Sequence, residues 1–130
     1  MDALVRGFED TTLDMAKWTH AAHLTVALYY LQHHSRDEAT RRMRDGLQRF
    51  IAAKGVAPTA YHETITLAWM AVVARFLEEH DGDPDLAGGL VRECCDKHYL
   101  LAFYSRDVLM SDAARTHWVA PDVAPISTRR

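Results

Sequence analysis

Residues 18–31, WTHAAHLTVALYYL, form the most apolar helical pattern in the chain. Apolar side chains fall on most faces of a helix with 3.6 residues per turn, which is typical of a helix at the centre of a bundle. We expect this helix to run from Asp14, as N-cap or first-turn acid, to about His33. The other predicted elements are therefore expected to pack around it.

Helix start and stop signals place further helices along the chain. Ser35 and Glu38 have the spacing of a capping box at the start of an amphipathic, arginine-bearing helix. Gly55 and Pro58 are suited to end that helix. The predicted helices cover residues 1–12, 14–33, 36–54, 59–80, 85–97 and 112–118.

The pattern as a whole predicts an all-α protein, a compact bundle of four to five helices with a short extended C-terminal tail. A length of 130 residues fits a single helical domain over 1–130, in which residues 119–130 form the tail. Residues 99–104, YLLAFY, fit a helix or a strand by pattern alone. The all-helical surroundings favour a helix there.

Composition and charge narrow the class of protein. A formal net charge of -3 lacks the basic surplus of proteins that hold nucleic acid through phosphate contacts. We expect no membrane span, because no apolar run approaches about 18 residues, and residues 1–10 do not have the pattern of a secretory signal. The adjacent Cys94 and Cys95 do not readily bridge each other, which favours reduced thiols and a cytoplasmic, bacterial-type protein.

Two groups of polar side chains stand at the starts of apolar helices. His20 and His23 are three residues apart, so their Cβ atoms are expected about 5–6 Å apart on one helix face. His62 and Glu63 open another helix, and Thr66 follows one turn after His62. We expect these two groups to line one partly buried pocket.

Three interpretations of this predicted pocket stay open. His20, His23 and His62 could hold a divalent metal such as zinc, with Glu63 as a further ligand. A metal-free pocket could instead bind a small molecule, with His20, His62 or Glu63 as catalytic acid or base. In the third interpretation these side chains are hydrogen-bonded core or capping groups of a non-catalytic structural or interaction protein. The predicted ligand-binding side chains are His23, Tyr61, Thr66, Trp69 and Arg106.

Arg106 is the candidate that lies far from both histidine groups in the sequence. It follows the aromatic run 99–104, where a turn could let it bind a carboxylate or a phosphate. A structural ion pair with Asp107 or Asp112 is the alternative. The sequence does not decide whether the protein is an enzyme, or whether it forms a homodimer through its apolar, aromatic C-terminal part.

Four sequence motifs together give the chain a resemblance to a known group of proteins. They are W-T-H-x-x-H-L at 18–24, Y-H-E-T-I-T at 61–66, Y-S-R at 104–106 and A-R-x-x-W-V-x-P-D at 114–122. In this combination, over nearly its full length, the chain resembles a group of small, uncharacterised bacterial all-helical proteins. The resemblance implies that the two histidine motifs belong to one site, and it implies no particular activity.

Overall fold

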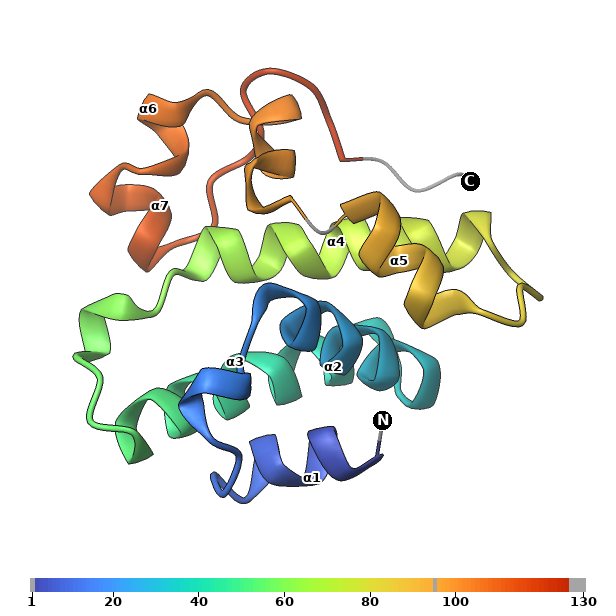
Figure 1. The fold of residues 1–130 in the computed structure, drawn as a ribbon. Coiled ribbons are helices and arrows are strands. Elements are labelled where there is room, and N and C mark those ends of the chain that lie inside the picture. The colour runs from blue at the N-terminus through green and yellow to red at the C-terminus, as the bar shows by residue number, and fades with distance from the viewer. Residues whose placement is uncertain (1, 95, 127–130) are drawn as a thin grey trace. The chain divides into compact units, whose positions relative to one another are not determined.

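The computed structural model describes residues 2–94 and 96–126. These residues form seven α-helices, three 3-10 helices and no strand (Figure 1), which confirms the predicted all-α fold. The number of α-helices exceeds the four to five predicted because two short ones, α6 (Arg106–Leu109) and α7 (Asp112–Thr116), have only four and five residues. Cys95 and the end of the predicted tail, 127–130, lie outside the described residues.

The chain divides into two compact units, residues 1–61 and residues 62–130. The first unit contains His20 and His23, and the second contains His62 and Glu63. The expectation of one domain over 1–130 stays a prediction.

Unit 1 is built from three α-helices that contact one another pairwise. The middle helix is apolar on most faces, as predicted, and buries Leu24, Val26, Leu28 and Tyr30 among others. Its elements are α1 (Asp2–Glu9), η1 (Met15–Lys17), α2 (His20–His33), α3 (Arg36–Ala53) and η2 (Pro58–Ala60).

An aromatic cluster of unit 1 joins α1 and α3 to the end of η1. Phe8 of α1 has no exposed surface, and its ring stacks on Trp18 with centroids 4.5 Å apart. Phe50 of α3 lies 5.6 Å from both rings. A Cβ atom at Gly46 would come within 2.6 Å of the Phe8 ring, so glycine is what lets α3 approach α1 this closely.

The central helix of unit 1 begins later than predicted. Asp14 caps the short helix η1 instead, because its Oδ1 accepts a hydrogen bond from the backbone N–H of Ala16 at 3.0 Å. Trp18 leaves the helical region of φ/ψ space, and Thr19 caps α2 through a 3.1 Å bond from Ala22 N–H. The predicted start at Asp14 is therefore wrong, and Thr19 sets the position of the histidines.

The amphipathic helix α3 has the predicted signals at its ends. Ser35 Oγ accepts from the N–H of Glu38 at 3.2 Å, which confirms the N-cap. The Glu38 carboxylate accepts from Arg41 and Arg42. Gly55, at a φ of 73°, follows the end of the helix in the left-handed conformation that glycine adopts at low cost.

Unit 2 is organised along α4 (Glu63–Glu79), which contacts α5 (Leu86–Cys94), η3 (Lys97–Ala102) and α7. Ten residues of α4 are buried, including Trp69 and the two threonines Thr64 and Thr66. The aromatic run 99–104 begins in η3, which confirms that it is helical rather than extended. None of the described helices is both long and apolar enough to span a membrane.

The described part of the predicted tail, residues 119–126, contains no helix and is tied to unit 2 by hydrogen bonds. The Tyr104 hydroxyl donates to the Val119 carbonyl at 2.6 Å, and Val123 N–H donates to the Phe103 carbonyl at 2.9 Å. Thr64 Oγ1 donates to the His117 carbonyl at 2.7 Å and accepts from Val119 N–H at 3.1 Å. One side chain of α4 thus fixes the chain as it leaves α7.

Candidate functional site

The two histidines of unit 1 lie together at the start of α2. Thr19 caps the helix, so His20 is its first residue and His23 stands almost one turn later. Their ring centroids are 6.5 Å apart, with the ring planes nearly perpendicular at 89°. The structure therefore places these two side chains on one face, as their spacing predicts.

His23 has the most unusual environment of the predicted site residues. Part of the residue is exposed, but its Nε2 atom is buried and has no hydrogen-bond partner among the described residues. Burial lowers the pKa of His23 to about 4, and the neighbouring His20 acts in the same direction. The imidazole is therefore neutral at pH 7, with one buried nitrogen unsatisfied.

Aromatic rings form the wall beside His23. Trp18 stacks against the imidazole with centroids 5.7 Å apart, and Phe8 in turn stacks on the indole. Burial in apolar surroundings disfavours the charged imidazolium, which is the physical cause of the low pKa. The same surroundings strengthen any hydrogen bond that the buried nitrogen makes.

His62 has both ring nitrogens engaged within unit 2. Its Nδ1 accepts from the backbone N–H of Ile65 at 3.1 Å, so the side chain is the N-cap of α4. The proton is therefore on Nε2, which donates to the carbonyl of Leu109 at 2.8 Å. In this conformation His62 offers no lone pair to a metal, and its bonds fit the capping interpretation.

Burial also shifts the pKa of His62. Partial burial lowers it, and the positive charge of Arg115 acts in the same direction, against the raising effect of the Leu109 hydrogen bond. The neutral form is thus the one that the fold prefers. Protonation of Nδ1 would remove the acceptor that caps α4.

The other predicted ligand-binding residues of unit 2 serve different parts of the fold. Thr66 is buried, and its hydroxyl donates to the carbonyl of His62 at 2.8 Å. Trp69 is only 2% exposed and stacks on Tyr99 with centroids 5.9 Å apart. Glu63 is the first residue of α4, and Arg106 is exposed at the start of α6.

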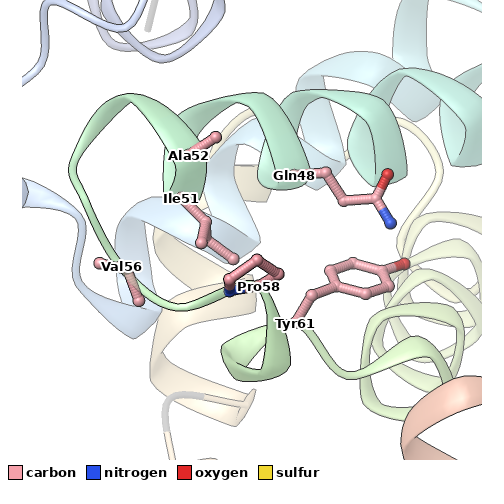
Figure 2. Close-up of a pocket in the computed structure, with 6 residues that line it drawn as sticks. All are labelled: Gln48, Ile51, Ala52, Val56, Pro58 and Tyr61. Atoms are coloured by element: carbon pink, nitrogen blue, oxygen red, sulfur yellow. The ribbon is translucent and has the colours of Figure 1, made fainter.

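Tyr61 lines an apolar hollow of unit 1 (Figure 2). The hollow has a volume of about 190 Å³, and its wall includes Ile51 and Val56 but neither His20 nor His23. Figure 2 shows the Gln48 amide and the Tyr61 hydroxyl at the same end of it. The structure therefore assigns Tyr61 to a surface that is separate from the histidine pair.

The described residues do not gather a metal site. Among residues 2–94 and 96–126, no three histidine, cysteine, aspartate or glutamate side chains form a group that could hold a metal ion. His20 and His23 lie in one unit and His62 in the other, so the expectation that they line one pocket stays a prediction.

The aromatic wall of the site was not predictable from the sequence. Phe8 and Phe50 have the helical spacing of core residues, which indicates burial but not which side chain they cover. Their contact with Trp18 joins three separate elements, α1, the end of η1 and α3. A signal for this contact was present in Gly46, whose place inside a helix indicates a close approach.

Comparison of the chain with protein-family models, with curated proteins and with solved structures gives no match.

Proposed function

We propose that unit 1 is a binding module for a small, uncharged, hydrogen-bonding molecule, which pairs with Nε2 of His23 without a metal. The observation that carries this proposal is the buried, unpartnered nitrogen in an aromatic wall. A buried polar atom without a partner costs roughly 1–3 kcal/mol. Such a cost is typical of a group that is kept for a ligand rather than for the fold.

The acid–base properties of His23 favour binding over proton transfer. An effective general base has a pKa near the working pH, whereas the pKa of His23 is about 4. A neutral imidazole is instead a constant hydrogen-bonding group across the neutral range. The apolar wall disfavours a charged ligand, because a charged group would lose its hydration there and no described side chain of the wall carries an opposite charge.

The structural interpretation applies best to His62. Both of its nitrogens are bonded, one to the start of α4 and one to the end of α6. We infer that His62 stabilises unit 2 and that the ligand-binding role belongs to His23. The adjacent cysteines of the sequence support a cytoplasmic location as part of the same proposal.

The proposal is tested by NMR on protein with ¹⁵N-labelled histidines. Formamide and ethanol are the neutral probes, acetate is the charged probe, and Zn²⁺ tests the metal alternative. The expected result is a saturable shift of the His23 Nε2 resonance with a neutral probe and no response of His62. Saturable uptake of one Zn²⁺ per chain at His23, or no response of His23 to either neutral probe, would overturn the metal-free proposal.

A further inference from the structure

A polar groove runs along α1, α2 and α3 of unit 1. Two open hollows of about 360 and 310 Å³ share the side chains of Glu9, Tyr30 and Arg42, so they form one continuous depression. We refer to this depression as the arginine groove. The first hollow adds Arg6 and His34 to its lining, and the second adds Arg41, Asp45 and Arg49.

The floor of the arginine groove is fixed by two hydrogen bonds. Tyr30 is 1% exposed, and its hydroxyl donates to the Glu9 carboxylate at 2.7 Å. Arg49 Nε donates to the backbone carbonyl of Glu9 at 3.1 Å, across 40 residues of sequence. These bonds join α1 to α2 and to α3, so the groups that face the groove are held in place by the fold.

The guanidinium donors of the arginine groove are only partly engaged by carboxylates. Arg41 pairs with Glu38 and Asp45, and Arg42 donates from Nε to the same Glu38 at 2.8 Å. Within the described residues, the terminal nitrogens of Arg42 make no hydrogen bond and Arg6 makes no ion pair. The lining also contains the Glu9 carboxylate, and the charge of Arg6 helps to lower the pKa of Asp10, so the groove offers a ligand guanidinium donors rather than an excess of positive charge.

We propose that the arginine groove binds an oxyanion, the phosphate or carboxylate group of a small organic anion. Guanidinium donors are suited to such groups, because two parallel N–H bonds match two oxygens of the anion. Arg42 lines both hollows and Arg6 lines the first, so these two are the binding cations. Glu9 opposes the anion, and its bond to Tyr30 restrains its carboxylate.

Isothermal titration calorimetry at constant ionic strength tests this site, with inorganic phosphate and acetate as separate probes. Saturable binding of either probe is expected, and the tighter one identifies the natural group as phosphate or carboxylate.

Arg42→Gln should weaken binding about tenfold, since it removes a charged hydrogen bond. Glu9→Gln should tighten binding a few-fold, because it removes the opposing charge. Arg6→Gln provides a second loss-of-binding variant if Arg42→Gln does not fold.

Arg36→Gln is the matched control, because Arg36 is an exposed arginine of α3 that lines neither hollow. It should leave the affinity unchanged. An equal loss in Arg36→Gln and Arg42→Gln would show unspecific attraction and overturn the site, as would weaker binding in Glu9→Gln or no saturable binding of either probe. His23→Leu should bind phosphate or acetate as the wild type does, which separates this proposal from the one for His23.

Discussion

At the scale of single residues, two histidines near helix starts have opposite hydrogen-bonding states. His62 uses one nitrogen to cap α4 and the other to bind the Leu109 carbonyl. His23 buries Nε2 without a described partner. Because a satisfied group stabilises a fold and an unsatisfied one destabilises it, the two side chains should respond in opposite directions to removal.

Two glycines inside helices provide a residue-scale prediction about packing. Gly46→Ala should lower the free energy of unfolding by about 1–3 kcal/mol, because its Cβ would lie 2.6 Å from the Phe8 ring, which Trp18 and Phe50 hold in place. Gly89→Ala should raise the free energy of unfolding by up to about 1 kcal/mol, because alanine has the higher helix propensity. Its Cβ would lie 3.4 Å from the Phe76 ring, an ordinary contact distance, so no clash offsets this gain. Urea denaturation of both variants measures these changes. A neutral Gly46→Ala would contradict the close packing of α1 and α3.

At the scale of elements, side-chain caps determine where the site residues stand. Thr19 rather than Asp14 begins α2, and this places His20 and His23 in the first turn of the helix. His62 in turn begins α4 and ties it to the end of α6. Because Thr19 is the N-cap of α2, His20 and His23 stand inside that helix, whereas His62 is itself the N-cap of α4.

Variants of His62 test its capping role. His62→Ala should lower the free energy of unfolding by about 2 kcal/mol, because it removes the cap and the bond to Leu109. His62→Asn should lower it by about half as much, since asparagine is a good N-cap but is too short to replace both bonds. Chemical denaturation at pH 7 gives both values. Equal losses in the two variants would argue against the cap.

Two buried threonines of α4 provide a matched pair at the same scale. Thr64→Val should cost about 1–3 kcal/mol and speed hydrogen exchange at the Val119 amide, because Thr64 both donates to His117 and accepts from Val119. Thr66→Val should be nearly neutral, since its hydroxyl donates to a helix carbonyl, that of His62, which also accepts from the Thr66 N–H. Denaturation combined with hydrogen exchange distinguishes them. Similar losses would contradict the specific role of Thr64 in holding the tail.

At the scale of the whole molecule, the helices were predictable from the sequence, but the environment of the site was not. Helical spacing, Ser35 and Gly55 identify α3 without any tertiary information. The surroundings of His23 depend instead on tertiary packing, because the Trp18 ring beside it is stacked in turn on Phe8, a residue of another helix. The same limit applies to the arginine groove, where Tyr30 and Glu9 meet only through packing.

The pH dependence of stability is a property of the whole chain. The folded pKa of His23 is about 4, below the ordinary value of 6.5, so the unfolded chain binds more protons between these values. Protonation of His23 therefore does not weaken the fold above pH 6.5, and the free energy of unfolding falls as the pH drops toward 4, by about 2 kcal/mol after allowance for the partial exposure of the ring. His62 acts in the same direction. Urea titrations from pH 7 to 4.5 should show the loss, and His23→Leu should reduce it; an unchanged slope in that variant would contradict the assignment.

The binding proposal for His23 requires that this side chain be kept at a cost to stability. Its most direct test is the free energy of unfolding of His23→Leu at pH 7, measured by urea denaturation beside the wild type. Leucine removes the buried nitrogen without a partner and retains apolar contact with Trp18. The variant is predicted to be more stable than the wild type by about 1 kcal/mol. A loss of stability of the same size would show that His23 is a satisfied structural group, and would contradict the proposed binding role.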